Sequence, residues 1–281
     1  MTGCSSGIGR ATAVLLARSG WPVYATARHT DALRDLQALG CRTLQLDVTD
    51  EDSLQAAVRT VVEEHGAVGV LVNNAGFSQS GAIETVPPAQ ARQQFETNVF
   101  GPARLTQLVL PGMRAQGWGK VVNIGSMGGR LTFPGGGWYH ATKYALEALS
   151  DALRFEVAGF GIDVVLVEPG FIRTGFSEAA ASSIDGADTM AAGGDPYREF
   201  TAGVLASTRD AYERGPLVRL GGDPDDVARV VLEAVTSDRP KARYPVTASA
   251  RLLRALRLAL PDRAWDAFMT RQFPQPGRPR G

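Results

Sequence analysis

A tyrosine and a lysine four positions apart carry the strongest chemical signal in the chain. Tyr139 and Lys143 fall in a predicted helix over residues 139–158, and this spacing places them on one helix face. An ammonium beside a phenol favours the phenolate, so we expect the pKa of Tyr139 to lie below its ordinary value of about 10. Tyr139 is then a candidate general acid and base near neutral pH. Taken separately, the two residues are also common as a buried tyrosine and a helix-face lysine.

Ser126 and Asn98 are further candidates for chemistry. Ser126 follows a strand candidate over residues 120–124, and open α/β sheets bind ligands at the carboxyl ends of their strands. Its hydroxyl could hydrogen-bond a substrate oxygen, or it could be an ordinary loop serine. The helix through Asn98 meets Pro102, which has no N–H to bond the Asn98 carbonyl. That carbonyl could hold a water molecule that leads to Lys143, although a kink without chemical purpose is the alternative.

The start of the chain has the composition of a phosphate-binding turn. The segment Thr2-Gly3-Cys4-Ser5-Ser6-Gly7-Ile8-Gly9 is typical of a strand-to-helix turn, whose glycines let backbone amides approach a phosphate at a helix N-terminus. Glycines also serve ordinary tight turns, so this motif alone is weak. The cofactor-binding residues that it predicts are Gly3, Ser5, Ser6, Gly7, Ile8 and Gly9.

Arg28 bears on the choice of dinucleotide. It ends a strand candidate over residues 21–27, at the position where an acid would bind the ribose 2′-OH and an arginine would take a 2′-phosphate. NADP(H) is therefore favoured over NAD(H), with Arg28 as the bidentate phosphate partner. The alternative is a solvent-exposed arginine that opens a helix.

Short β-rich runs alternate with helical stretches, and this alternation must position the residues above. The strand candidates are residues 21–27, 43–46, 68–72, 120–124, 163–167 and 241–246. The helix candidates are residues 8–19, 30–38, 50–65, 89–115, 139–158 and 223–236. Alternation requires right-handed crossovers, so we predict an α/β fold with a doubly wound, Rossmann-type parallel sheet and helices on both faces. We assign residues 1–273 to this single domain and expect the tail, residues 274–281, to be disordered.

The strand that should precede the glycine-rich turn is missing, so we predict that the first strand is truncated or absent. A central strand buries roughly five or six apolar side chains, worth about 10 kcal/mol, which is as much as the whole stability of a typical domain. The natural start is accordingly expected upstream of Met1. The intact mass of the native protein tests this hypothesis, because a mass that matches residues 1–281 would refute it.

Composition narrows the class of protein. The 281 residues are 44% hydrophobic and 21% charged, which is typical of a globular chain, and the formal net charge is zero. Zero net charge provides no field to attract nucleic acid, so a small molecule is the expected partner. Cys4 and Cys41 are too few for a disulfide framework, and the histidines form no ligand-spaced cluster, so no metal is expected. No apolar run approaches the ~18 residues of a membrane-spanning helix, so we expect a cytoplasmic protein without an integral membrane segment.

Several motifs together resemble one family. They are Thr2 to Gly9, Asn73-Asn74-Ala75-Gly76, Gly125-Ser126 and Tyr139-His140-Ala141-Thr142-Lys143. In this order and spacing they strongly resemble the short-chain dehydrogenase/reductase family over residues 1–175, with a looser match beyond. The segments Gly3 to Gly9, Val23 to Arg28 and Leu44 to Val48 look most like the hydroxysteroid and retinol dehydrogenase-like branch. The missing first strand is a departure from the family pattern.

The resemblance implies a role for each matched residue. The resemblance implies that Ser126, Tyr139 and Lys143 are catalytic and that Asn98 takes part in a proton relay. It places Asp47 and Val48 near the adenine, and Asn74, Ala75 and Gly76 near the adenosine ribose. It places Pro169, Gly170, Ile172 and Thr174 beside the nicotinamide, where Tyr139 and Lys143 also contact the cofactor. By the same resemblance, helices 89–115 and 139–158 pair across a two-fold axis in a homodimer or homotetramer.

Three stretches bear on the substrate. Residues 175–222 lack a helix or strand pattern and form either a substrate lid or a plain surface insertion. The aromatic residues near the catalytic positions suit either an apolar pocket or a hydrophobic core, and they are Phe133, Trp138, Phe171 and Phe176. Residues 251–260 are basic and amphipathic, and packing against the domain is favoured over resting on a membrane or covering the substrate.

These observations predict an NADP(H)-dependent oxidoreductase that interconverts an alcohol and a ketone or aldehyde on a lipophilic, steroid- or retinoid-like substrate. One alternative is a 3-oxoacyl reductase of the fatty-acid or polyketide type, for which the arginines of residues 175–222 are too scattered to indicate a carrier site. Another is a nonenzymatic NADPH-binding regulator. The complete set of Ser126, Tyr139 and Lys143 argues against a regulator, which has no need for an acidic phenol.

Overall fold

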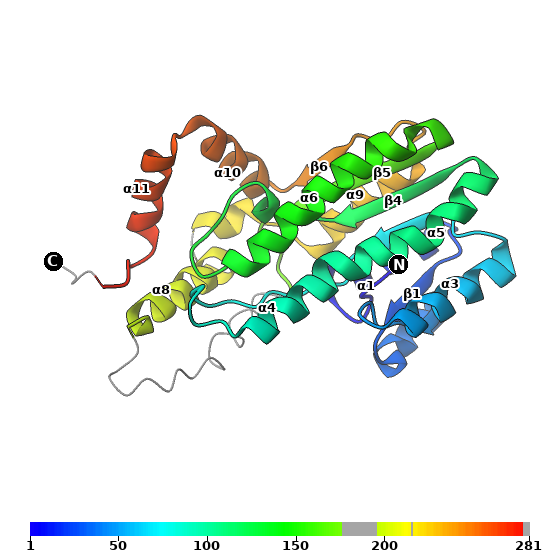
Figure 1. Cartoon of the computed structure of the whole chain (residues 1–281), viewed down its shortest axis with the longest axis horizontal. Helices are drawn as coiled ribbons and strands as arrows, with labels where there is room; N and C mark the ends of the chain where they lie inside the picture. Colours follow the sequence, from blue (N-terminus) through cyan, green and yellow to red (C-terminus); the bar gives the residue numbers. More distant parts are fainter. Residues whose placement is uncertain (176–195, 215, 278–281) are drawn as a thin grey trace.

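A parallel sheet forms the centre of the molecule (Figure 1). The computed structural model describes residues 1–175, 196–214 and 216–277. Its strands are β1 Tyr24–Ala27, β2 Arg42–Gln45, β3 Val70–Asn73, β4 Gly119–Ile124, β5 Ile162–Pro169 and β6 Arg243–Val246. They are hydrogen-bonded in the orders β1-β2 and β3-β4-β5-β6, and every pair is parallel. Each strand overlaps a predicted one.

Helices cover both faces of this sheet. The α-helices are α1 Gly7–Arg18, α2 Arg34–Ala38, α3 Glu51–His65, α4 Pro88–Phe95, α5 Gly101–Gln116, α6 Gly137–Val157, α8 Arg198–Arg209, α9 Pro224–Thr236, α10 Ala248–Ala259 and α11 Asp262–Gln272. Short 3₁₀ turns are η1 Thr30–Leu33, η3 Met127–Gly129, η4 Ala158–Phe160 and η6 Pro216–Leu220, and π-helical turns are η2 Glu96–Phe100 and η5 Asp210–Arg214.

Alternate residues of the central strands pack into separate hydrophobic clusters. Val122 and Val165 belong to the cluster that contains buried residues of α1 and α9. Their neighbours Val121 and Val164 belong to the cluster that contains buried residues of α3 and α5. Successive side chains of a strand point to opposite faces, so the two clusters lie on opposite sides of the sheet. The predicted doubly wound α/β fold is confirmed.

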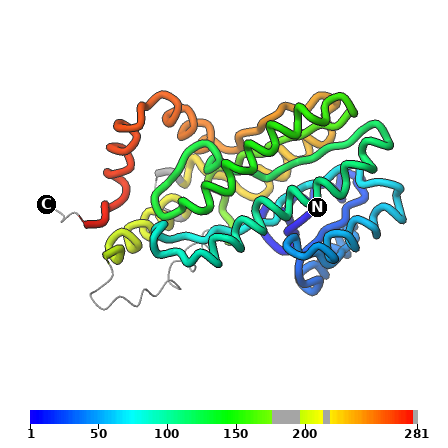
Figure 2. Tube along the Cα trace, viewed as in Figure 1, coloured from blue at the N-terminus to red at the C-terminus, as the bar shows by residue number. Residues whose placement is uncertain are grey.

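Residues 1–4 lie between β1 and β3, where the two parts of the sheet meet. Thr26 N donates to Met1 O at 3.1 Å and Cys4 N donates to Thr26 O at 2.9 Å, while Thr2 N donates to Val72 O at 3.0 Å on the other side. These bonds join both neighbours, but residues 1–4 form no regular strand. The segment carries the glycine-rich turn to the middle of the molecule, as the blue end of the chain shows in Figure 2.

The predicted helix over residues 89–115 is interrupted. α4 ends at Phe95, the π-helical turn η2 contains Asn98, and α5 begins at Gly101. Pro102 falls in the first turn of α5, where a missing N–H leaves no intrahelical bond unmade. The helix irregularity that Pro102 predicts is therefore present, and it takes the form of a π turn, a feature often found at functional sites.

Helices α8, α10 and α11 form one end of the molecule, beyond the carboxyl ends of the strands (Figure 1). The prediction that residues 175–222 lack a helix is wrong for the described part, because α8 buries Phe200 and Val204 against Ala82. These two residues are four apart on one helix face, a signal that the many small residues nearby obscured. Residues 176–195 and 215 lie outside the described residues.

The C-terminal helices pack on the domain. Leu253 of α10 and Trp265 and Met269 of α11 are buried in one cluster with Leu131 and Phe171. Packing of residues 251–260 against the domain is therefore confirmed, whereas α11 was not predicted. Of the tail, residues 274–277 form no helix or strand, and residues 278–281 lie outside the described part. None of the described helices has the length and apolar character needed to cross a membrane.

Candidate active site

A cavity of about 1240 Å³ lies at the carboxyl ends of the strands and extends under the C-terminal helices. The predicted site residues that line it are Gly3, Ser5, Ser6, Gly7, Ile8, Gly9, Arg28, Asp47, Val48, Asn74, Ala75, Gly76, Ser126, Tyr139, Lys143, Pro169, Gly170, Ile172 and Thr174. They come from the ends of different strands, so the sheet brings together residues that are far apart in sequence. Asn98 is buried and lies behind the wall of the cavity.

The glycine-rich turn forms one end of the cavity, and its shape depends on glycine. Gly3 and Gly7 have φ angles of +69° and +54°, a backbone region that favours glycine. A Cβ on Gly9 would lie 2.1 Å from the Gly3 carbonyl oxygen. Asn74 holds the turn against β3 by donating its side-chain amide to the Thr2 and Gly3 carbonyls at 3.0 and 2.9 Å. The turn is therefore a fixed, close-packed cradle of backbone.

This cradle fits the phosphates of a dinucleotide. Ser6 is the N-cap of α1 and makes no side-chain capping hydrogen bond, so the first amides of the helix face the cavity without a side-chain partner. Such an N-terminus favours anions through its free donors and its dipole. Arg28 lines the same cavity directly after β1, and no ion pair involves it among the described residues. A 2′-phosphate suits this position, where an unpaired guanidinium takes the place of an acid.

Asp47 and Val48 line the cavity after β2. The Asp47 carboxylate accepts hydrogen bonds from Thr49 N at 2.9 Å and Thr49 Oγ1 at 2.8 Å, which fixes the turn before α3. Val48 contacts α5 so closely that a Cβ on Gly101 would lie 2.4 Å from the Val48 carbonyl oxygen. These contacts hold the cavity wall after β2 against α5.

Ser126, Tyr139 and Lys143 lie together at the centre of the cavity. Ser126 caps η3, with its Oγ accepting from Gly128 N at 3.0 Å, and it also hydrogen-bonds the side chain of Tyr139. Lys143 Nζ lies 5.7 Å from the centroid of the Tyr139 ring and donates to the Ile124 carbonyl at 2.8 Å. The spacing on α6 and the end of β4 therefore bring the three side chains into one group, as the sequence predicts.

The expected fall in the pKa of Tyr139 is wrong for the protein alone. Burial raises the pKa of Tyr139 to about 12, and the hydrogen bond with Ser126 opposes this only in part. Burial also lowers the pKa of Lys143 to about 8, against the opposing charge of Glu147. The Lys143 ammonium is held by the Ile124 carbonyl, so desolvation of the phenol outweighs the nearby charge. Near neutral pH, Tyr139 is a protonated phenol that can give a proton.

Asn98 holds a loop rather than lining the cavity. Its side-chain amide donates to Phe77 O at 2.9 Å and to Thr142 Oγ1 at 3.1 Å, and its Oδ1 accepts from Phe77 N at 3.1 Å. Phe77 lines the cavity, and Thr142 is the residue before Lys143 on α6. Asn98 thereby connects the loop after β3 to the catalytic helix, a contact that the sequence argument about its carbonyl did not predict.

His140 is a site residue that the sequence argument missed. It is buried beside Tyr139, its Nδ1 lies 2.9 Å from Gly128 O, and its Nε2 accepts from Phe133 N at 3.1 Å. Burial lowers the pKa of His140 to about 4, so the ring is neutral and Nδ1 donates. The ring therefore connects the Ser126 loop to the loop that carries Phe133. Its position next to Tyr139 was the available signal, but its partners are distant in sequence.

The other end of the cavity is apolar and aromatic. Phe133 and Phe171 stack with ring centroids 6.3 Å apart, and Tyr212 meets Phe171 edge-on at 5.2 Å. Helices α8, α10 and α11, called the cap helices below, complete this end together with the residue after α11. Their lining residues are Val204, Leu253, Phe268, Met269 and Phe273. Trp138 packs against Phe95 at 6.5 Å instead of lining the cavity, and Phe176 lies outside the described residues. No motif marks the cap residues, so only the fold could bring them here.

Within residues 1–175, 196–214 and 216–277, no group of three His, Cys, Asp or Glu side chains could hold a metal ion. The groups that line the centre of the cavity are Ser126, Tyr139 and Lys143, next to the glycine-rich turn. A doubly wound sheet that presents such a set above such a cradle defines a nicotinamide-dependent oxidoreductase. A family model described as short chain dehydrogenase matches residues 1–185, and the chain belongs to this family.

Relatives of known sequence and structure extend this result. The chain is 35% identical to the NADPH-dependent 3-dehydrocapnine reductase of Ornithobacterium rhinotracheale, over 95% of this chain and 93% of that protein. It is 41% identical to the 3-ketodihydrosphingosine reductase of Bacteroides thetaiotaomicron, over 63% of this chain and 65% of that protein. A solved short-chain dehydrogenase from Streptomyces avermitilis superposes with a TM-score of 0.77 at 37% identity, covering 96% of this chain and 94% of the other. The hydroxysteroid and retinol dehydrogenase-like branch stays a prediction.

Proposed function

We propose that the protein is an NADPH-dependent reductase that converts a ketone or aldehyde of a lipophilic molecule to the alcohol. The observation that carries this proposal is a protonated Tyr139, hydrogen-bonded to Ser126, between the phosphate cradle and an aromatic pocket. A buried phenol that holds its proton is suited to donate it to a developing alkoxide.

Each residue of the site would have a distinct role in cofactor binding or proton transfer. Gly3 to Gly9 and Arg28 would hold the phosphates of NADPH, and Lys143 would bind the ribose. Bound NADPH supplies the hydride that adds to the carbonyl carbon. Ser126 would hold the carbonyl oxygen while Tyr139 transfers its proton to it, which completes the alcohol. Lys143 stabilises the tyrosinate left behind until a proton returns from solvent through the Asn98 region.

The substrate end supports a long apolar molecule. Its lining includes Phe133, Phe171, Val204, Phe268 and Met269, with Asp210 and a few polar side chains among them. The two reductases named above act, by their names, on keto or dehydro forms of capnine and sphingosine bases, and we propose a keto substrate of that lipophilic kind. Of the proposed lid over residues 175–222, α8 lies in the described part, and its Val204 and Thr208 line this end.

A homodimer through α5 and α6 is also proposed. Phe100 beside α5 and Tyr144, Leu149 and Phe155 of α6 are exposed, and Phe155 keeps 89% of its surface accessible. Large apolar side chains gathered on two neighbouring helices are typical of a contact surface. Cys4 and Cys41 are buried free thiols, which is consistent with the proposed cytoplasmic location.

The proposal is tested by a panel of ketones and aldehydes with NADPH and NADH, and by Tyr139→Phe. We expect Tyr139→Phe to lower kcat by about 10²- to 10⁴-fold, the usual contribution of a general acid, while the Kd for NADPH stays within about two-fold. Absorbance at 340 nm, a property of the reduced nicotinamide, follows turnover. A wild-type protein that binds NADPH but reduces nothing in the panel would favour the regulator instead.

A further inference from the structure

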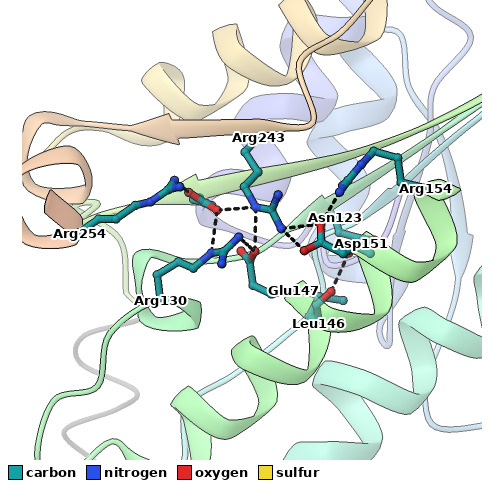
Figure 3. A network of polar contacts seen from close by, with 10 residues as sticks. Asn123, Arg130, Leu146, Glu147, Asp151, Arg154, Arg243 and Arg254 are labelled. Carbon is teal, nitrogen blue, oxygen red and sulfur yellow. Dashed lines mark hydrogen bonds and ion pairs between the residues drawn. The ribbon is translucent and has the colours of Figure 1, made fainter. Parts of the chain in front are cut away.

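A network of ion pairs surrounds two buried glutamates (Figure 3). Glu147 and Glu168 are 4% and 1% exposed, which is unusual for carboxylates and requires compensating charges. Arg130 and Arg243 each approach Glu147 at 3.0 Å, and Arg243 also reaches Glu168 at 3.3 Å. Arg254 completes the set, with its Nη1 3.0 Å from Glu168 Oε2.

The network joins the elements that make up the active site. Glu147 follows Lys143 by one turn of α6, and its charge acts on that lysine. Glu168 directly precedes Pro169, whose segment lines the cavity. Arg254 belongs to α10, and its neighbour Leu253 lines the cavity from the cap side. Among the described residues, Arg254 is therefore the side chain through which the cap helices form an ion pair with the buried carboxylates.

The start of α10 is held in a different way. Phe171 N donates to Ser249 Oγ at 3.2 Å, and Thr247 has a φ of +84°, a strained value for a β-branched residue. Thr247 is the only non-glycine residue with a positive φ in the described ranges. Thr247 Oγ1 accepts from Ala250 N at 3.3 Å and caps α10, and Leu253 packs in the buried hydrophobic cluster. Ionic contacts further along the helix add to this anchoring. Arg254, more than one turn beyond Ser249, provides such a contact.

Loss of Arg254 should be tolerated by the fold. Glu168 would lose the hydrogen bond that Arg254 donates to its Oε2, while the charges of Arg243 at 3.3 Å and Arg130 at 3.8 Å from its Oε1 would remain. The Arg254 side chain is one-third exposed, so its removal opens no large internal cavity. The main effect is expected on the position of α10.

We propose that Arg254 is a positioning residue whose ion pair with Glu168 fixes α10 as the roof of the substrate cavity, and so sets affinity for the part of the substrate beyond its carbonyl. This rests on the proposed reductase function. Leu253 contacts that distal part of the cavity, whereas the phosphate cradle and Tyr139 are on other elements. Cofactor binding and proton transfer should therefore be independent of Arg254.

The test compares Arg254→Met with Arg251→Met. Arg251 is on the same helix, is exposed and has no ion pair among the described residues, so it is a matched control. For Arg254→Met we expect a KM about ten-fold higher for a long-chain ketone, with a change below about two-fold for a short ketone and for the Kd of NADPH. Arg254→Lys should restore part of the long-chain affinity, since it keeps the charge but not the planar fork. Arg251→Met should leave all of these values unchanged.

Hydrogen–deuterium exchange of residues 248–259 gives a readout that needs no substrate. Faster exchange in Arg254→Met than in Arg251→Met supports the proposal, and equal exchange overturns it. A uniform loss of kcat, NADPH binding and melting temperature would also overturn it, because that result indicates general structural damage. If the wild-type protein reduces no carbonyl compound, the proposed function fails, and the exchange comparison still decides whether Arg254 positions α10.

Discussion

We propose that the choice between NADPH and NADH depends on Arg28. It follows β1, lines the cavity and has no ion-pair partner among the described residues. Arg28→Ala should raise the Kd for NADPH by about 10- to 100-fold, the loss of one to two charge-assisted contacts, and leave the Kd for NADH nearly unchanged. Fluorescence titration of both cofactors measures the ratio. An unchanged ratio contradicts the assignment of Arg28 to the 2′-phosphate.

We predict that cofactor use depends on pH through Lys143. Burial lowers the pKa of Lys143 to about 8, so the ammonium is present below this pH and is lost as the pH rises through it. If the ammonium binds the ribose, kcat/KM for NADPH should be level below about pH 8 and fall above it, since this ratio reports groups of the free enzyme. A profile that stays level to pH 10 excludes this role. Lys143→Met should remove the inflection along with most of the activity.

At the scale of elements, the junction between residues 1–4 and α1 is the most constrained part of the site. An alanine Cβ at Gly9 would lie 2.1 Å from Gly3 O and 2.4 Å from Asn74 Nδ2. Gly9→Ala should therefore cost about 1–3 kcal/mol of stability through overpacking and should abolish measurable NADPH binding. Thermal unfolding and NADPH titration check the two effects.

Gly159→Ala is a suitable control for Gly9→Ala, because no heavy atom lies within 4 Å of the added Cβ. Gly159→Ala should change the melting temperature by less than about 2 °C, and it should leave the NADPH affinity unchanged. Equal behaviour of the two variants would mean that the close approach at Gly9 has no consequence for the cradle.

The elements differ in how far local sequence predicts them. The central strands β3, β4 and β5 are rich in apolar residues, and the two-residue period of a strand places Val121 and Val122 on opposite faces without further information. α8 and α11 were missed because their stability comes from burying Val204, Trp265 and Met269 against distant parts of the chain. Tertiary contacts of this kind override weak local preference.

At the scale of the whole molecule, burial of Glu147 makes stability dependent on pH. Burial and the neighbouring Glu168 raise the pKa of Glu147 to about 7, although Arg130 and Arg243 oppose the shift. The folded state therefore binds the proton more strongly than the unfolded state between pH 4.5 and 7. This contribution to stability is full at low pH and is lost as the pH rises through 7.

Glu147→Gln removes the contribution of this carboxyl group to the pH dependence of the free energy of unfolding. Urea unfolding of both proteins at pH 5 and pH 8 should show that the wild type loses more free energy of unfolding over this interval than Glu147→Gln does. Other titrating groups are common to both proteins and cancel in the comparison. The same pH dependence in both proteins would contradict the raised pKa of Glu147.

The sequence by itself determined the fold class and the positions of Gly3 to Gly9, Arg28, Ser126, Tyr139 and Lys143. These depend on short spacings, strand ends and helix turns, which local geometry fixes. The tertiary structure alone decided that Tyr139 keeps its proton, that His140 and Asn98 connect loops, and that Arg254 reaches Glu168. The reason is physical, because desolvation and ion pairing depend on which distant side chains exclude water from a group, and no local spacing contains that information.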